Sequence, residues 1–246
     1  MSECKILALN GSPRARNSNT DKLLKAFLAG AEQAGAQTEI VYAADLNVKD
    51  CLGCFGCWKK TPGCCVLKDD MPPLLDKIRF ANIVVWATPL YHYGMTARLK
   101  RIMERTLPLC KPYIVKRGAH YGHPSRYPEQ DAKNMLIANC GFPERHHFDA
   151  LVEQFRHLSM AGNELIGAVL CPAGEVLAHI DCPWYFEAVR CAGQEIVTSG
   201  CISSETAAVL AKDFIPLEMF LRNANACWNV PGDIAPTLEE ALNGKT

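Results

Sequence analysis

Short apolar segments alternate with segments of helical periodicity along most of this chain, and this alternation constrains the fold more than any other feature. Apolar runs of five to seven residues bounded by turns are typical of buried parallel strands. Strands that alternate with helices form a parallel sheet covered on both faces. We therefore predict an α/β fold with a doubly wound five-stranded parallel sheet, in the order 2-1-3-4-5, whose strands are residues 5–10, 38–42, 82–87, 134–139 and 164–170.

The first predicted helix has the clearest boundaries. Ser18 or Asn19 is its expected N-cap, and Gly35 is its expected C-terminal stop. Its apolar face has helical spacing and comprises Leu23, Leu24, Phe27, Leu28 and Ala31. Further helices are expected at about 70–80, 95–107, 147–161, 184–198 and 203–224, and the tail after Trp228 is expected to be loop with a short helix.

The predicted organisation is one main domain with an appended segment. Residues 1–180 form the sheet domain, which carries a cysteine-rich loop at 47–68 and an ordered insertion at 109–131. Residues 181–246 form a helical C-terminal extension that packs on the same domain.

Charge and apolar patterning exclude several classes of protein. The 246 residues include 26 basic and 26 acidic side chains, so net charge gives no reason to expect binding to nucleic acid or to an anionic membrane surface. No apolar run approaches the roughly 18 residues that a membrane-spanning helix needs, and the N-terminus lacks the apolar core of a signal peptide. We therefore expect a soluble cytoplasmic protein without nucleic-acid or membrane partners.

The turn after the first predicted strand has the composition of a phosphate-binding loop. It reads Asn-Gly-Ser-Pro-Arg-Ala-Arg-Asn-Ser-Asn-Thr and ends where a helix begins, so unpaired backbone N–H groups and a positive dipole face it. It lacks both the Gly-x-Gly-x-x-Gly fingerprint and the Walker lysine. The alternative is an ordinary turn with a polar cap. We predict a phosphomonoester site, with charge from Arg14 and Arg16 and ligands Ser12, Arg14, Ser18, Asn19 and Thr20.

The turn after the third predicted strand can bind a flat ring. It reads Thr-Pro-Leu-Tyr-His-Tyr-Gly, and doubly wound sheets bind ligands at the carboxyl edge between strands 1 and 3. An isoalloxazine ring needs an aromatic or apolar wall and backbone donors, which such a turn supplies. The alternative is a loop whose aromatic residues anchor the next helix. The predicted ring contacts are Pro89, Leu90, Tyr91, His92, Tyr93 and Gly94, with another wall at Cys140 and Gly141.

Five of the thirteen cysteines are clustered, in the run Cys-Leu-Gly-Cys-Phe-Gly-Cys at 51–57 and in the pair 64–65. Four compactly spaced thiolates hold iron–sulfur clusters, and four thiolates also hold structural zinc. Metal-free thiols, a redox disulfide, or a plain loop packed around Phe55 and Trp58 remain as alternatives. The other eight are scattered and are expected to be small buried core residues: Cys4, Cys110, Cys140, Cys171, Cys182, Cys191, Cys201 and Cys227.

Three motifs in order resemble the NADPH-dependent FMN reductase family, especially its iron–sulfur flavoprotein branch. They are Asn-Gly-Ser-Pro-Arg followed by Ser-Asn-Thr, Cys-x2-Cys-x2-Cys with a later Cys before Asp-Asp-Met, and Thr-Pro-Leu-Tyr-x-Tyr-Gly. The resemblance implies a flavodoxin-like fold, bound FMN, and a homodimer or homotetramer. It also implies a [4Fe–4S] cluster on Cys51, Cys54, Cys57 and Cys65, with Cys64 as the alternative fourth ligand.

The predicted activity is an FMN-dependent oxidoreductase that takes electrons from NAD(P)H and passes them to a quinone, free flavin or another small aromatic acceptor. The cofactor carries the chemistry, so no catalytic acid or base is expected. One alternative is an electron carrier in which ferredoxin feeds the cluster and the cluster feeds FMN. Another is a binding module that senses a phosphorylated ligand.

The insertion is basic and aromatic between Lys111 and Tyr127. It has the charge to hold the phosphates of a nicotinamide nucleotide or to border the flavin across a dimer. The alternative is a solvated hairpin. A metal site at His120 and His123 is a weaker alternative, because pairs of surface histidines are common.

Overall fold

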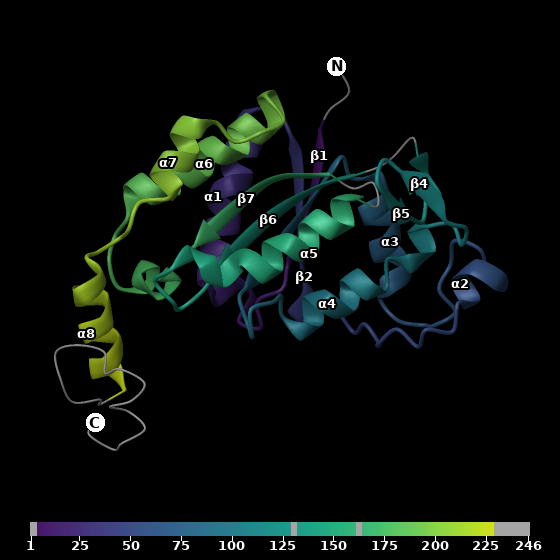
Figure 1. The fold of residues 1–246 in the computed structure, drawn as a ribbon, viewed down its shortest axis with the longest axis horizontal. Coiled ribbons are helices and arrows are strands. Elements are labelled where there is room, and N and C mark those ends of the chain that lie inside the picture. The colour runs from purple at the N-terminus through teal and green to yellow at the C-terminus, as the bar shows by residue number, and fades with distance from the viewer. Residues whose placement is uncertain (1–3, 129–131, 161–163, 229–246) are drawn as a thin grey trace.

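A five-stranded parallel sheet forms the centre of the molecule (Figure 1). The computed structural model describes residues 4–128, 132–160 and 164–228. The sheet order is β2-β1-β3-β6-β7, which is the predicted order 2-1-3-4-5 because β4 and β5 form a separate hairpin. The flavodoxin-like fold is therefore confirmed, with strands β1 (Lys5–Asn10), β2 (Gln37–Tyr42), β3 (Ile83–Pro89), β6 (Lys133–Asn139) and β7 (Leu165–Cys171).

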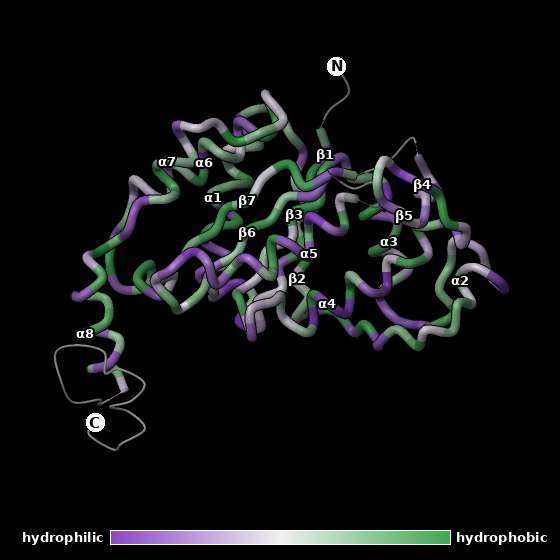
Figure 2. Tube along the Cα trace, in the orientation of Figure 1, coloured by the Kyte–Doolittle hydropathy of each residue, from purple (hydrophilic) through white to green (hydrophobic). Residues whose placement is uncertain are grey.

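Helices cover both faces of the sheet (Figure 1). Successive strand residues point to opposite faces, so Ile6 and Ala8 join one hydrophobic core while Leu7 and Leu9 join the other. Figure 2 shows hydrophobic residues along these strands. The first core is closed by α1 (Asn19–Gln33) and α6 (Pro183–Thr198), and the second by α3 (Met71–Phe80), α4 (Ala97–Glu104) and α5 (Asp149–Met160).

The boundaries of α1 agree with the sequence prediction. The Ser18 side chain accepts a hydrogen bond from the Asp21 amide and is the N-cap. Gly35 follows the helix with φ +89°, a conformation that favours glycine. All five residues of the predicted apolar face are buried. Ser18 thereby fixes the end of the helix that faces the candidate phosphate loop.

Two glycines let α1 and α6 pack backbone to backbone. A Cβ atom on Gly30 would lie 1.9 Å from the Arg190 carbonyl oxygen, and one on Gly193 would lie 1.9 Å from the Phe27 carbonyl oxygen. These contacts leave no room for a methyl group because the opposing atoms belong to helix backbone.

Replacing Gly193 with alanine is therefore expected to destabilise the protein. Overpacking costs about 1–3 kcal/mol, and the better helix propensity of alanine returns about 1 kcal/mol of this. We expect a lower midpoint of urea unfolding for Gly193→Ala. The half-buried Cys191 on the same helix supplies a control, because Cys191→Ala adds no atom to the helix contact. An unchanged midpoint for Gly193→Ala would contradict this account of the packing.

The C-terminal helices differ from the prediction of one helix over 203–224. The chain instead forms α7 (Ser204–Leu210) and α8 (Leu217–Cys227). Pro216 is the physical reason, because proline lacks an amide hydrogen and disfavours helical backbone in the residue before it. Figure 1 shows α8 extending away from the helices that cover the sheet. The predicted short helix after Trp228 lies outside the described residues.

The shorter elements lie in the connections. The insertion forms an antiparallel hairpin, and its expected end at 129–131 lies outside the described residues. No helix in the described part of the chain is long and apolar enough to cross a membrane. The short elements in the connections are the hairpin strands β4 (Val115–Arg117) and β5 (His120–Gly122), the helix α2 (Gly56–Lys59), and the 3-10 helices η1 (Ala15–Asn17), η2 (Ala43–Asp45), η3 (Leu107–Leu109), η5 (Arg145–Phe148) and η6 (Gly174–Ala178).

The scattered cysteines only partly follow the prediction that they fill the core. Three are buried, namely Cys140, Cys171 and Cys182. Burial raises the pKa of Cys171 to about 12, so this thiol stays protonated. The prediction is wrong for Cys201 and Cys227, which are exposed.

Candidate functional site

The carboxyl ends of the central strands are in register, which brings the predicted loops to one edge of the sheet. Asn10 pairs with Ala87, Pro89 pairs with Asn139, and Asn139 pairs with Cys171. The loops that follow β1, β3 and β6 therefore start at the same level. This edge is where ligands bind in open parallel sheets.

Three of the predicted phosphate ligands already have hydrogen-bond partners for their side chains. The Asn19 amide donates to the Gly174 carbonyl oxygen at 2.8 Å, and the Thr20 hydroxyl donates to Asn139 Oδ1 at 2.7 Å. The Ser18 hydroxyl donates to the Ala15 carbonyl oxygen at 2.7 Å while it caps α1. These side chains therefore hold the loop against β6 and η6. Their role as phosphate ligands stays a prediction.

Backbone amides are the free donors of this loop. Asn19 and Thr20 are the first two residues of α1, so their N–H groups have no partner within the helix. The dipole of a 15-residue helix adds positive potential at this end. Ser12 is buried beside it, and its hydroxyl oxygen accepts the Arg14 amide at 3.3 Å. The helix end is thus prepared for an anion mainly by its backbone.

The two arginines of the loop have different surroundings. Arg16 pairs with Asp45 at 2.9 Å, and its guanidinium lies 4.1 Å from the ring centre of Tyr42. The Arg14 side chain is exposed and makes no hydrogen bond or ion pair among the described residues. Arg14 is therefore the cation that remains available to a phosphate.

The predicted ring-binding turn is a tight hairpin turn with a strained backbone. The amides of Tyr91 and Gly94 donate to each other's carbonyl oxygens at 2.9 and 3.0 Å. His92 and Tyr93 have φ values of +47° and +61°, which is the pattern of a type I′ turn without its usual glycine or asparagine. Strain of this kind is common at ligand sites. The amides of His92 and Tyr93 have no backbone partner in the described structure, so they are available to a ligand.

Pro89 and Leu90 form the inner part of this turn. Pro89 is the buried last residue of β3, and the Leu90 amide donates to the Asn139 carbonyl oxygen at 2.8 Å. Tyr91 and Tyr93 are more than half exposed, at 51% and 55% of their surface. The turn therefore has an apolar base and exposed aromatic rings, as a flavin site requires.

The loop after β6 adds a second aromatic wall. The ring centres of Phe142 and His147 are 4.4 Å apart, and those of Tyr93 and His147 are 5.8 Å apart. His147 also forms an ion pair with Glu144 at 3.1 Å when the imidazole is protonated. The ring of His147 therefore connects this loop to the turn after β3.

Cys140 and Gly141 occupy different environments. Cys140 is buried in the second core, where desolvation raises the pKa of its thiol, and its backbone amide and carbonyl are both hydrogen-bonded. Gly141 is exposed. Only Gly141 thus remains open to a ligand, and the assignment of both residues to the flavin stays a prediction.

A cavity of about 250 Å³ lies beside this edge. Its walls come from the loops after β6 and β7 and from residues 212–220 ahead of and within α8. Arg145 lines it, but its guanidinium donates to the carbonyl oxygens of Leu170 and Leu210 and so fixes the loops.

Four of the five clustered cysteines line a single cavity at the other end of α4. These are Cys51, Cys54, Cys57 and Cys65, which are the four predicted ligands, whereas Cys64 is exposed and is not part of the lining. The pKa of the Cys57 thiol is raised, mainly by burial and next by the neighbouring Cys65. Cys54 and Cys51 add smaller effects in the same direction. The structure therefore brings the predicted set together.

The potential donors that line this cavity are the four thiols and the Arg105 guanidinium. Within residues 4–128, 132–160 and 164–228, no three His, Cys, Asp or Glu side chains are placed to bind one metal ion. A zinc ion needs its thiolates about 2.3 Å from one point. Arg105 also lines the cavity, and its buried Nε has no hydrogen-bond partner among the residues that the structure describes.

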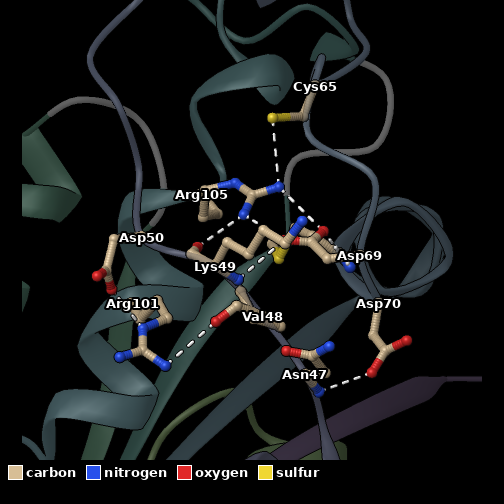
Figure 3. Close-up of polar contacts among 10 residues, drawn as sticks. Asn47, Val48, Lys49, Asp50, Cys65, Asp69, Asp70, Arg101 and Arg105 are labelled. Carbon is tan, nitrogen blue, oxygen red and sulfur yellow. Dashed lines mark hydrogen bonds and ion pairs between the residues drawn. The ribbon is translucent and has the colours of Figure 1, made fainter.

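The cysteine loop is anchored on α3 and α4 (Figure 3). The Asp70 carboxylate accepts the Asn47 amide at 2.7 Å, and the Asp69 carboxylate accepts the Lys49 amide at 2.9 Å. Trp58 in α2 donates from its indole to the Leu107 carbonyl oxygen at 3.2 Å. The loop that carries the thiols is therefore attached at its start to the residues just before α3 and in its middle, through Trp58, to η3.

Asp69 and Arg105 form a buried ion pair under this loop. The two side chains are 0% and 1% exposed, and the closer of their two contacts is 2.6 Å. Burial alone would raise the pKa of Asp69, but hydrogen bonds from Arg105, Lys49 and Met71 outweigh it and lower the pKa. The carboxylate is therefore charged in the folded protein at neutral pH.

This lowered pKa predicts a loss of stability in acid. The carboxylate of Asp69 contributes stability that is fully present above its unfolded pKa of about 3.9 and is lost as the pH falls through the lower folded value. Asp69→Asn should therefore melt at a lower temperature than the unaltered protein at pH 7, and this difference should shrink below about pH 4. A difference in melting temperature that stays constant from pH 7 to pH 3 would contradict the assignment.

The basic insertion makes structural contacts. Arg126 donates to the carbonyl oxygens of Pro108 and Cys110, and the Tyr127 ring lies 3.6 Å from the Arg79 guanidinium carbon. The His123 ring packs against Trp58 with ring centres 4.8 Å apart and the ring planes tilted by 53°. The hairpin therefore braces α2, and its role in nucleotide binding stays a prediction.

Sequence reasoning missed several residues of both sites. Asn139 and Gly174 fix the phosphate loop, but their partners are 119 and 155 positions away in the chain. His147 had a local signal, because it follows the loop of the fourth strand in a His-His pair. Arg105 had none, since a single arginine near the end of an amphipathic helix is an ordinary surface residue.

Comparison with known proteins places the chain in a family. A family model described as NADPH-dependent FMN reductase matches residues 4–179. An iron–sulfur flavoprotein of Methanocaldococcus jannaschii is 34% identical over 105 residues, which are 43% of this chain and 53% of that protein. One of Archaeoglobus fulgidus is 36% identical over 102 residues, which are 42% of this chain and 48% of that protein. The chain spans about half the length of the curated relatives it matches.

A solved structure supports the fold. The FMN-dependent NADH-azoreductase from Bacillus anthracis, in complex with FMN, aligns with a TM-score of 0.57 over 79% of this chain and 98% of that chain, at 16% sequence identity. Identity this low shows a shared fold alone. The family model covers well over half of the sequence, and the chain therefore belongs to the NADPH-dependent FMN reductase family.

Proposed function

We propose that the chain binds FMN at the carboxyl edge of its sheet and acts as an NAD(P)H oxidoreductase. Membership of the NADPH-dependent FMN reductase family supports FMN as the cofactor and NAD(P)H as the electron donor. A quinone, a free flavin or another small aromatic molecule is the proposed acceptor, because such molecules stack against a flat ring.

The observation that carries this proposal is the convergence of two sets of free donors on one edge of the sheet. The N-terminal amides of α1 and the side chain of Arg14 lie at the end of β1, where a phosphate would bind. The amides of His92 and Tyr93 lie at the end of the adjacent strand β3, where they suit the polar edge of an isoalloxazine ring. A phosphate and a ring are the two ends of FMN.

The residues of the site have binding and orienting roles. The Asn19 and Thr20 side chains keep the helix end in place, while exposed Tyr91 and Tyr93 provide aromatic surface for the ring. FMN, when bound, supplies the capacity to accept hydride and to deliver electrons. No side chain acts as acid or base in this scheme.

Anaerobic purification followed by absorbance spectroscopy tests the proposal. The protein should bind FMN and appear yellow, and addition of NADPH should bleach the flavin absorbance. A folded protein that remains colourless with added FMN would refute the proposed site. A flavin that binds but is not reduced by NADPH or NADH would refute the proposed donor.

A second function is favoured by the cavity shared by four thiols. We propose that Cys51, Cys54, Cys57 and Cys65 hold a [4Fe–4S] cluster, in which case a reduced ferredoxin is the alternative electron donor. The names of the relatives from Methanocaldococcus jannaschii and Archaeoglobus fulgidus support this reading. Iron and sulfide assays on the anaerobic protein decide whether the cluster is present, and reduction by ferredoxin in preference to NADPH would favour this function.

A further inference from the structure

Arg105 contacts one of the clustered cysteines directly. Its Nη2 donates to Cys65 Sγ at 3.3 Å, and Figure 3 shows the guanidinium between the sulfur and the carboxylate of Asp69. The residue follows the last turn of α4 and is 2% exposed. The neighbouring thiol of Cys64 is exposed, and the hydrogen bonds of the Arg105 side chain to described residues go to Lys49, Asp69 and Cys65.

The guanidinium is fixed in this position by two further groups. Nη1 and Nη2 donate to the two carboxylate oxygens of Asp69 at 2.6 and 3.1 Å, and Nη1 also donates to the Lys49 carbonyl oxygen at 2.7 Å. A planar guanidinium held in a two-pronged contact keeps one orientation. The donor to Cys65 is therefore already oriented before any group occupies the cavity.

The chemistry of the pair suits an anionic group bound by thiolates. Groups that hydrogen-bond to metal ligands fix their orientation, and hydrogen bonds to sulfur and nearby charge set the potential of an iron–sulfur cluster. Reduction adds negative charge to the cluster, and a buried cation next to one ligand stabilises that charge. The Nε of Arg105, which has no partner in the described part of the chain, is a further donor that an anion in the cavity would satisfy.

We propose that Arg105, held by Asp69, selects Cys65 over Cys64 as the fourth ligand of the cluster and raises the cluster's reduction potential. This inference rests on the proposed iron–sulfur centre. Arg105 is a positioning residue in this account, since its contact is with a ligand sulfur and the cavity rather than with the reacting atoms.

The test compares two variants of the buried pair with a matched control. Arg105→Lys keeps the charge and loses the planar fork, and the double variant Arg105→Gln/Asp69→Asn removes both charges together, so that neither is left buried alone. The control is Arg101→Gln on the same helix, which breaks contacts to Asp50 and Val48 in the same loop without touching a thiol. Circular dichroism verifies the fold of each full-length protein.

Each protein is reconstituted anaerobically with iron(II) and sulfide and then treated with a thiol alkylating reagent. Peptide mass spectrometry measures modification at Cys64 and Cys65, and an EPR-monitored titration measures the midpoint potential. In the unaltered protein and the control we expect Cys65 to be protected and Cys64 to be modified. In both variants the ratio of modification at the two thiols should move toward one. The midpoint potential should fall in the double variant.

Several results would overturn the inference. One is protection of Cys64 instead of Cys65 from alkylation in the unaltered protein. This result would decide against the inference without any variant. Another is a folded variant that keeps the modification pattern and midpoint potential of the control. Failure of the unaltered protein to take up iron and sulfide would refute the iron–sulfur centre and this inference with it. The proposal that the protein binds FMN is tested separately and would not be affected by that result.

Discussion

Cys65→Ala is expected to abolish assembly of the iron–sulfur cluster, whereas Cys64→Ala is expected to leave it intact. The two thiols are adjacent in sequence, but only Cys65 lines the cavity with the other three cysteines and receives a hydrogen bond from Arg105. A [4Fe–4S] cluster takes four thiolate ligands, and the Cys65→Ala variant offers only three in this cavity. We therefore expect iron and sulfide per chain to fall to background in the first variant only.

The measurement is an iron and sulfide assay with an absorbance spectrum on both variants after anaerobic reconstitution. The paired design controls for the general effect of removing a thiol from this loop. Equal loss of iron in both variants, or loss in Cys64→Ala alone, would show that the fourth ligand has been assigned wrongly.

Arg14→Gln is expected to weaken FMN binding by roughly 10- to 150-fold, since a hydrogen bond to a charged group contributes about 1.5–3 kcal/mol. The Arg14 side chain has no other partner in the described part of the chain, so its removal should leave the fold unchanged. Arg16→Gln is the matched control, because the Arg16 side chain is engaged with Asp45 and Tyr42. Flavin fluorescence titration measures both affinities.

Riboflavin separates loss of phosphate binding from damage to the whole site. It carries the same ring without the phosphate, so Arg14→Gln should leave its affinity unchanged. If Arg14→Gln and Arg16→Gln weaken FMN equally, or if riboflavin and FMN are affected alike, the loop does not hold the phosphate in the way proposed here.

The architecture was predictable because the strands of the central sheet, apart from the more polar β2, each contain a continuous apolar run, and the turns carry local signals. The cap at Ser18 and the stop at Gly35 are decided by residues within one helical turn: the stop was predicted correctly, and Ser18 was one of the two predicted caps. The break before α8 also had a local cause in Pro216, which the prediction overlooked. Local chemistry therefore accounts for most of the elements and their order.

The candidate sites were less predictable because their geometry depends on distant partners. The side chains of Asn19 and Thr20 look like phosphate donors in the sequence, yet they bond to residues 155 and 119 positions away. Arg105 and Asp69 are separated by 36 positions, and only the packing of α4 against the cysteine loop makes them a buried pair. Spacing alone also left Cys64 and Cys65 equivalent, and the fold distinguishes them.

The central claim is that the carboxyl edge of the sheet binds FMN, and titration of the isotopically labelled protein with FMN, followed by amide NMR, tests it most directly. The account predicts saturable shifts at one FMN per chain that are concentrated at the amides of residues 12–20 and 89–94. Saturating FMN that leaves these amides unshifted, or that shifts only amides at another surface of the protein, would contradict it.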